Sequence, residues 1–248
     1  MVFDANVFVG ESLYGNSLTL DDLKSLMYDS GVDKAIIRAL KPPDLDLDRA
    51  NRNIADIQRE NENLVGFGRI NPLLKDAAIH TKKAISEYRL KGIHLHPWEE
   101  NYRISSDIVD EVMQVVREED VPVYVSSGYP MVSHPLQVQE FAGRYPEVTI
   151  IVTHGGQQDI SGLSFDDALL VAEESKNVIF DISGVYRRDF IELLVECAGA
   201  DRIVFGSCTP YMNMKFEITR ITSTHLPEET KKRILHTNIE RILQKHRK

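Results

Sequence analysis

Short apolar runs alternate with helical segments along almost the whole chain, and this alternation limits the fold more than any single motif. Runs such as 34–40 and 148–154 are strand-like, whereas 76–89 and 107–119 have the spacing of amphipathic helices. About eight such units predict parallel strands with right-handed crossovers, closed into a (β/α)8 TIM barrel of the α/β class. An open doubly wound sheet is the alternative, but no Gly-x-Gly-x-x-Gly turn follows the first strand. No Gly-, Pro- or Ser-rich linker is present, so we expect one domain, 1–248.

The charge of the chain argues against two classes of partner. Its formal net charge is -9, and such a surface attracts neither phosphate backbones nor anionic lipids. No apolar run approaches the roughly 18 residues of a membrane span, and the first residues lack a signal-peptide pattern. Two cysteines, Cys197 and Cys208, do not make a disulfide framework. We therefore expect a cytoplasmic protein that takes a small-molecule substrate and binds no nucleic acid and no membrane.

The run 91–97 places two histidines two positions apart, between Gly92 and Pro97, at a predicted strand end. Residues two apart on a strand share a face, so His94 and His96 are expected to point the same way. In TIM barrels the active site lies at the C-terminal ends of the strands. If side chains alternate along each strand, the inward set there includes Asp4, Asn6, Phe8, Arg38, Arg69, Asn71, His94, His96, Ser126, His154, Asp181, Ser183 and Cys208.

Several motifs occur in the order found in a known family. They are Gly-Arg-Ile-Asn-Pro at 68–72, Gly-Ile-His-Leu-His-Pro at 92–97, Val-Thr-His-Gly-Gly at 152–156, Phe-Gly-Ser-Cys-Thr-Pro at 205–210 and a closing segment at 226–238. With these motifs the chain resembles the amidohydrolase-2 family, the metal-dependent hydrolases and decarboxylases of the amidohydrolase superfamily. The resemblance covers nearly all of the chain and implies an amidohydrolase-like barrel.

The resemblance also reveals departures at the site. The family usually opens with Asp-x-His-x-His, which supplies two metal ligands, whereas here Asn6 and Phe8 follow Asp4. Ser126 stands at the position of the strand-five histidine, and Cys208 at that of the strand-eight aspartate. The resemblance therefore implies the scaffold without implying the family's metal.

One hypothesis is a rearranged metal site. His154 and His96 match the family, and with Cys208 they would form a set of three ligands near Asp4, with His94 as an alternative to His96. Imidazole and thiolate ligands favour a divalent metal such as zinc, which would bring the pKa of a bound water toward about 7.

A second hypothesis keeps catalysis without a metal. His94, His96 and His154 could act as general acid or base, with Asp4 or Asp181 fixing a tautomer. Cys208 could be a nucleophile if a neighbouring imidazolium lowered its pKa. The groups expected to bind the substrate, with the arginines clamping a carboxylate, are Arg38, Arg69, Asn6, His94 and Ser126.

A third hypothesis is a barrel that binds a small molecule without catalysis. Trp98 and Tyr102 follow the fourth strand, where they would either contact a flat substrate or pack the loop against the rim.

We expect a hydrolase acting on a small carboxylated or acyl compound, with a decarboxylase or a non-catalytic barrel as alternatives. The expected catalytic residues are His154, His96, Asp4 and Cys208, and a homodimer is expected from the family alone.

Overall fold

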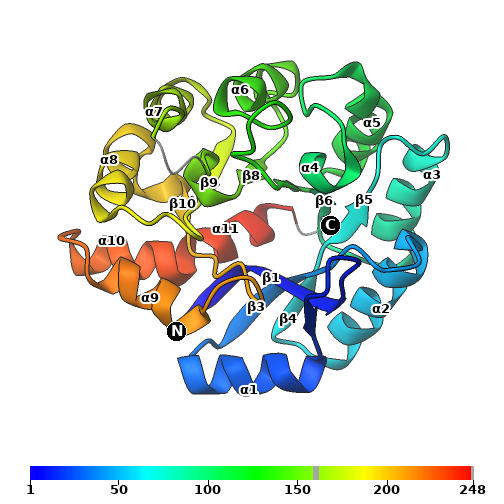
Figure 1. Ribbon diagram of the computed structural model, residues 1–248, viewed down its shortest axis with the longest axis horizontal. Coiled ribbons are helices and arrows are strands. Elements are labelled where there is room, and N and C mark those ends of the chain that lie inside the picture. Colours follow the sequence, from blue (N-terminus) through cyan, green and yellow to red (C-terminus); the bar gives the residue numbers. More distant parts are fainter. Residues whose placement is uncertain (159–161, 247–248) are drawn as a thin grey trace.

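The computed structural model describes residues 1–158 and 162–246. Within these ranges, parallel strands form a closed barrel inside a ring of helices (Figure 1). The barrel strands are β1 (Phe3–Glu11), β3 (Lys34–Ala39), β4 (Leu64–Gly66) continued by β5 (Gly68–Ile70), β6 (Ile93–Leu95), β7 (Val123–Val125), β8 (Ile150–Val152), β9 (Val178–Asp181) and β10 (Ile203–Val204). A short strand, β2 (Ser17–Leu18), pairs antiparallel with the end of β1. The predicted (β/α)8 fold is confirmed.

Backbone hydrogen bonds at two seams join the strands into a closed cylinder. The strand orders are β2-β1-β3-β4 and β10-β9-β8-β7-β6-β5, and Phe67, between β4 and β5, donates its N–H to Ile37 O at 3.0 Å. At the other seam Ala5 N donates to Phe205 O and Phe8 N to Thr209 O, both at 2.8 Å. The first strand therefore pairs with the last, as barrel closure requires.

Helices follow the strands in the order expected from the alternation. They are α1 (Leu20–Ser30), α2 (Leu47–Glu60), α3 (Ala77–Lys82) with the π-helical turn η1 (Lys83–Glu87), α4 (Pro97–Glu100), η2 (Asp107–Val109), α5 (Asp110–Glu119), α6 (Pro135–Arg144), η3 (His154–Gly156), α7 (Phe165–Glu174), α8 (Arg188–Ala198), η4 (Ala200–Arg202), α9 (Met214–Thr222), α10 (Glu228–Lys232), η5 (Arg233–Thr237) and α11 (Asn238–Lys245). Thr19 caps α1, because its hydroxyl accepts the N–H of Asp22 at 3.1 Å. No helix in the described ranges is long and apolar enough to cross a membrane.

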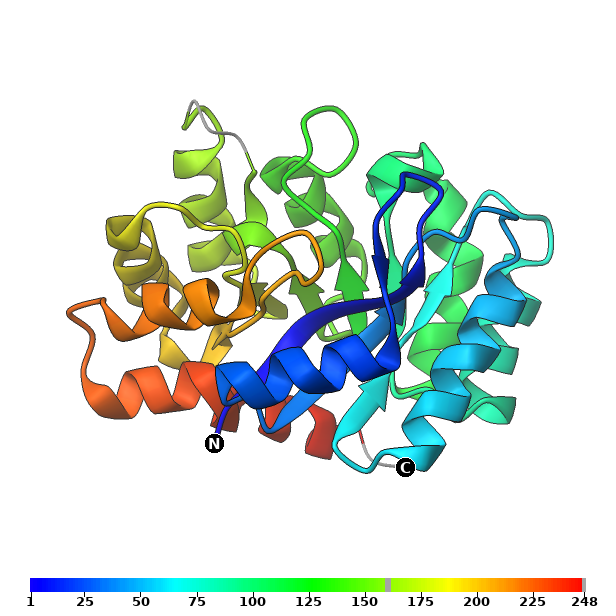
Figure 2. The ribbon, with the colours of Figure 1, turned by 60° about the horizontal axis from the view of Figure 1, so that its bottom comes forward.

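The barrel interior is filled at its N-terminal end. Phe3, Phe67 and Tyr124 pack there, and Ile239 and Ile242 of α11 cover them from below. Figure 2 shows α11, in red, and the N-terminus at this end and the long loops at the other. The open end is therefore the C-terminal end of the strands.

Several short elements were absent from the sequence prediction, among them β2 and α4. The strand expected over 91–97 ends at Leu95, and His96 instead begins α4, where its ring accepts the N–H of Glu99 at 3.2 Å. Pro97 occupies the first helical turn, a position that tolerates proline. This turn carries Trp98, Glu99 and Glu100 toward the barrel mouth.

Candidate active site

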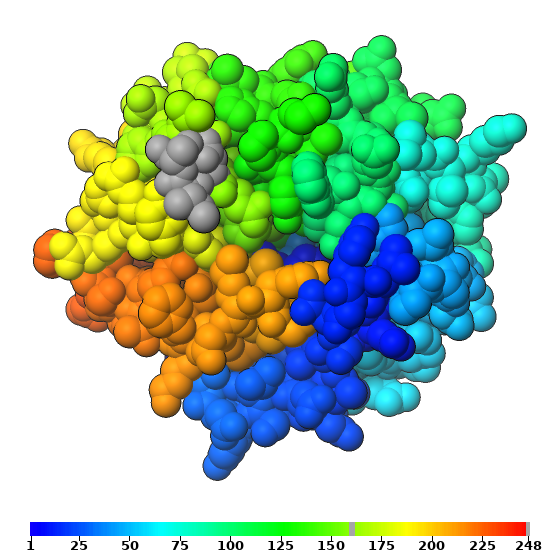
Figure 3. All heavy atoms as spheres, viewed as in Figure 1, coloured from blue at the N-terminus to red at the C-terminus, as the bar shows by residue number. Residues whose placement is uncertain are grey.

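A cavity of about 300 Å³ opens at the C-terminal ends of the strands. Its lining residues come from many parts of the chain: Phe8, Tyr14, His96, Trp98, Glu99, Ser126, Tyr129, Thr153, His154, Gln158, Cys208, Tyr211 and Met212. Figure 3 shows the surface hollowed near the centre of this face, where green, orange and dark blue segments meet. The predicted convergence of distant segments is present.

Aromatic rings make up much of the cavity wall. Trp98 and Tyr129 are stacked, with centroids 5.5 Å apart and planes 10° from parallel. Phe8 forms part of the wall and meets Tyr211 edge-on at 5.7 Å. Parallel and edge-on rings of this kind suit a flat, apolar molecule.

His154 has one tautomer fixed by the backbone. Its Nδ1 lies 2.9 Å from the carbonyl oxygen of Ser183, and because that oxygen only accepts, Nδ1 carries the hydrogen. In the neutral ring Nε2 is then an acceptor, and the side-chain amide of Gln158 lies 3.4 Å from it. Burial lowers the pKa of His154, although Asp181 opposes the shift. The ring therefore presents a neutral acceptor at the cavity.

His96 has the opposite tautomer. Its Nδ1 accepts the backbone N–H of Glu99, so Nε2 carries the hydrogen in the neutral ring. Burial, with a further contribution from Arg69 and then Arg38, lowers the pKa of His96 well below its usual range. His96 is thus a neutral donor and His154 a neutral acceptor on one cavity.

His94 lies beneath the cavity wall rather than in it. Its Nε2 is 2.9 Å from the hydroxyl of Ser126, which lines the cavity. Its ring meets those of Phe8 and His96 edge-on, each at 5.6 Å. Nδ1 finds no hydrogen-bond partner in the part of the chain that the structure describes. His94 and His96 are neighbours as expected, but only His96 reaches the cavity.

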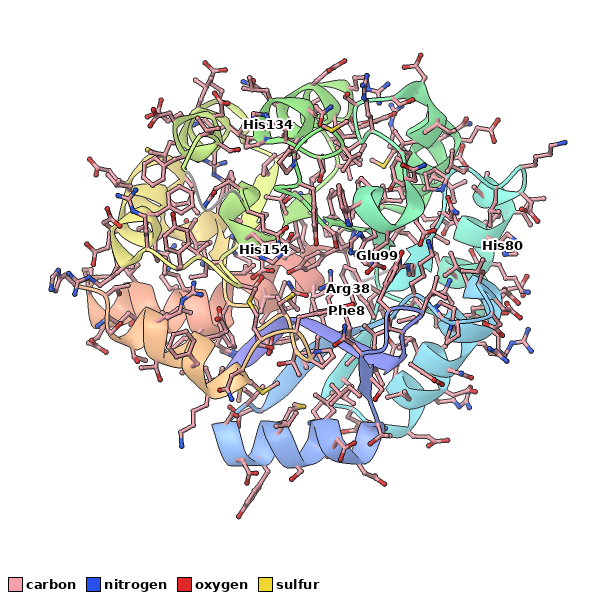
Figure 4. All side chains as sticks on the ribbon, in the orientation of Figure 1. Phe8, Arg38, His80, Glu99, His134 and His154 are labelled. Carbon is pink, nitrogen blue, oxygen red and sulfur yellow. The ribbon has the colours of Figure 1, made fainter. Side chains whose placement is uncertain are left out.

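Arg38 and Asn6 form a buried network under Phe8. The Arg38 guanidinium lies 4.6 Å from the Phe8 ring and 3.7 Å from the Tyr124 ring, and Nη2 donates to Asn6 Oδ1. The Asn6 amide in turn donates to Asp181 Oδ2 at 2.6 Å. Figure 4 shows Phe8 and Arg38 near the centre of the ring of strands. Asn6 is therefore a link between a cation and a carboxylate, and not a wall of the cavity.

Asp4 lies deeper in the barrel than expected for a catalytic residue. It is fully buried and is not part of the cavity wall. Its Oδ1 accepts the backbone N–H groups of Asn6 at 2.9 Å and Ser207 at 2.8 Å, so Asp4 ties β1 to the segment after β10. Burial raises the pKa of Asp4 to about 7, although these hydrogen bonds act against the shift. Asp4, predicted as a catalytic residue, therefore lies outside the cavity wall, and its contacts are those of a residue that joins two backbone segments.

We expect Asp4→Asn to change how stability depends on pH. The native pKa lies above the ordinary value of 3.8, so between about pH 4 and pH 7 the native state holds a proton that the unfolded state has lost. Stability from this group is present at low pH and falls as pH rises through this window, by up to about 4 kcal/mol. Urea unfolding of both proteins from pH 4 to 8 measures this, and parallel curves would contradict it.

Arg69, predicted to clamp a substrate carboxylate, forms a buried ion pair with two carboxylates of the protein. Its Nη2 donates to Glu99 and to Glu100, both at 2.6 Å, and Nε donates to Glu100 at 3.1 Å. Lys41 lies 3.2 Å from the second oxygen of Glu100. The guanidinium does not line the cavity, because α4 brings both carboxylates against it. Few donors are left for a ligand.

Cys208 reaches the cavity, but its surroundings do not favour a thiolate. It packs with Phe8 and Leu40, and burial, followed by Asp181, raises its pKa far above the ordinary value for a thiol. The expectation of a nucleophile or metal ligand needs a lowered pKa. The structure instead supports the alternative of a small buried apolar side chain.

The described residues do not assemble a metal site. Nowhere in the described ranges do three His, Cys, Asp or Glu side chains gather in an arrangement that would hold an ion. His96, His154 and Cys208, the ligand set of one hypothesis, all line the cavity but do not form such a group in this structure. Phe8 and the Arg38 guanidinium occupy the middle of the barrel mouth instead.

Several wall residues were missed by sequence reasoning. Tyr14 lies in the hairpin after β1, Tyr129 after β7, Tyr211 after β10 and Glu99 on α4. Each follows the C-terminal end of a strand. A survey of aromatic and acidic residues just after each strand would have found them.

Comparisons with known proteins agree with the fold. The family model described as amidohydrolase matches residues 44–245. A 5-carboxyvanillate decarboxylase from Sphingomonas paucimobilis is 15% identical, with a TM-score of 0.79 and 98% of each chain covered.

Two further solved structures have the same TM-score of 0.79. A dihydroxybenzoic acid decarboxylase from Polaromonas sp. JS666, with bound manganese and 2-nitroresorcinol, is 15% identical over 100% of this chain and 98% of that one. A TIM-barrel protein from Bordetella bronchiseptica is 16% identical, with 99% of each chain covered. A search of curated proteins found no match. At these identities the structural likenesses establish the fold alone.

Proposed function

The chain belongs to the amidohydrolase family, and from this premise we propose that it is a lyase that decarboxylates a small, flat aromatic acid bearing a hydroxyl group. One observation carries the proposal. Two neutral imidazoles in opposite tautomers, His96 and His154, face one cavity walled by aromatic rings. A donor and an acceptor in these positions suit a substrate with an acidic O–H and a second oxygen.

The chemistry follows from the two tautomers. The acceptor Nε2 of His154 takes the hydrogen bond, and during reaction the proton, of a phenolic hydroxyl, which raises electron density on the ring. The donor Nε2–H of His96 binds another substrate oxygen. The bond between the ring carbon and the carboxylate breaks, its electrons stay on the ring carbon, and CO2 leaves. That carbon takes a proton, so the net reaction consumes one proton from water.

The aromatic rings of the cavity wall also suit a flat aromatic acid. The similar solved structures include decarboxylases of aromatic acids, in agreement with this substrate class.

Turnover of a panel of hydroxybenzoic acids tests the proposal. We expect release of CO2 with formation of the matching phenol, measured by gas analysis and by chromatography. The same panel includes esters and lactones. Hydrolysis of these without CO2 release would contradict decarboxylation, and turnover of neither class would favour a barrel that only binds.

Hydrolysis remains a second candidate because of one contact. Ser126 Oγ lies 2.9 Å from His94 Nε2 and opens onto the cavity, as a nucleophile and its base would. However, burial and then Arg38 lower the pKa of His94 well below its usual range, which weakens it as a base. Covalent labelling of Ser126 by a fluorophosphonate would support hydrolysis, and an unlabelled Ser126 would favour the lyase.

A further inference from the structure

The Arg38 guanidinium is a buried cation with donors to spare. The Arg38 side chain is fully buried. Within the described ranges it forms no ion pair with a carboxylate, and two of its nitrogens have no hydrogen-bond partner. Nη2 is used by Asn6, whereas Nε and Nη1 find no hydrogen-bond partner among the described residues. Arginine stays charged in proteins, so this charge and two of its N–H groups are available to an anion.

The position of Arg38 is central to the barrel mouth. Its guanidinium contacts the ring of Tyr124, from β7, and the ring of Phe8, from β1. Phe8 also packs against Cys208, from the segment after β10. Of the two rings, Phe8 lines the cavity and Tyr124 does not. The Phe8 ring therefore lies between the guanidinium and a molecule bound in the cavity. Face-on contact with both rings partly stabilises the buried charge.

Arg69 shows what a satisfied guanidinium in this barrel looks like. Two carboxylates, Glu99 and Glu100, approach it directly. Asp181 approaches Arg38 only through the Asn6 amide. The contrast between the two arginines indicates that Arg38, unlike Arg69, has donors without a carboxylate partner among the described residues.

We propose that Arg38 is an anion subsite of the cavity: its Nε and Nη1 bind the carboxylate of an aromatic acid once the Phe8 ring turns aside, without a metal ion. This inference rests on the proposed function for its substrate class. It gives the carboxylate a fixed positive partner, in keeping with the absence of a group of three metal-ligating side chains among the described residues.

Binding of two matched probes tests the subsite. Benzoate and benzamide have nearly the same shape and differ in charge, and neither bears the hydroxyl that the proposed reaction needs. Calorimetric titration of the chelator-dialysed protein is expected to show benzoate binding at least about tenfold tighter, which is about 1.4 kcal/mol. Equal affinities, or a preference for benzoate that appears only after Mn²⁺ is added, would overturn the proposal.

Two variants locate the effect. Arg38→Met is expected to bring the ratio of the two affinities close to one, and a ratio unchanged in this variant would contradict the subsite. Phe8→Leu removes the covering ring and is expected to raise the ratio, whereas a fall would contradict the role of Phe8 as a cover. If Arg38→Met does not fold, the ratios of benzoate to benzamide affinity in the wild type and in Phe8→Leu still test the subsite.

The outcome is separable from that of the proposed function. Benzoate preference without decarboxylation of any hydroxybenzoate would sustain the subsite and reject the reaction. Decarboxylation with equal binding of benzoate and benzamide would do the reverse.

Discussion

Replacing His154 with asparagine is expected to lower kcat for decarboxylation by about 10²- to 10⁴-fold, the usual contribution of a general acid–base group. Asparagine suits this position because the backbone of His154 is left-handed, with φ of 59°, and asparagine tolerates that conformation. The variant therefore removes the acceptor Nε2 with little backbone strain. Steady-state kinetics on the best substrate of the panel measures the effect.

His80→Asn is the matched control. His80 lies on α3, away from His154, as Figure 4 shows, so we expect kcat to stay near the wild-type value.

In the wild type, protonation of His154 removes its acceptor. Because its pKa is lowered, kcat/KM should fall only when the pH drops below the ordinary histidine range. Equal activity of the His154→Asn variant and the wild type would rule out this residue as the base.

Glu100→Gln is expected to lower the free energy of unfolding by about 3 kcal/mol, because it leaves a buried arginine without one of its two carboxylates. Glu100 contacts Arg69 at 2.6 Å and Lys41 at 3.2 Å, and its side chain is only 3% exposed. Urea unfolding at pH 7 measures the change, and a shift of the midpoint at constant slope identifies it as a loss of stability.

Glu228→Gln provides the exposed counterpart. Glu228 also pairs with a lysine, Lys231, at 2.8 Å, but its side chain is 90% exposed, and exposed pairs contribute little. We expect its unfolding curve to overlay that of the wild type. Similar losses in the two variants would show that the Glu100 pair does not depend on burial for its effect.

The barrel was predictable because its signal is repeated along the chain. Each strand-like run must be covered on both faces, and the alternation with helices leaves few other topologies. The grouping of His96, His154, Ser126 and Cys208 at one end follows from the same topology, since each comes at or just after the end of a strand.

The roles within the site depend on contacts that no spacing reveals. Arg69 looked free to bind a substrate because α4, which carries Glu99 and Glu100, was read as loop. The tautomers of His96 and His154 are set by a backbone N–H and a backbone carbonyl, and the carbonyl belongs to Ser183, distant in the chain. Such contacts become visible only with the folded backbone.

Pairing of the first strand with the last also bears on how the protein is made. β1 leaves the ribosome early, yet its neighbour β10 and the covering residues Ile239 and Ile242 of α11 are synthesised some 200 residues later. Contacts of such large sequence separation form slowly. The nascent chain must therefore hold one edge of β1 unpaired throughout most of translation, when association with chaperones would shield it from aggregation.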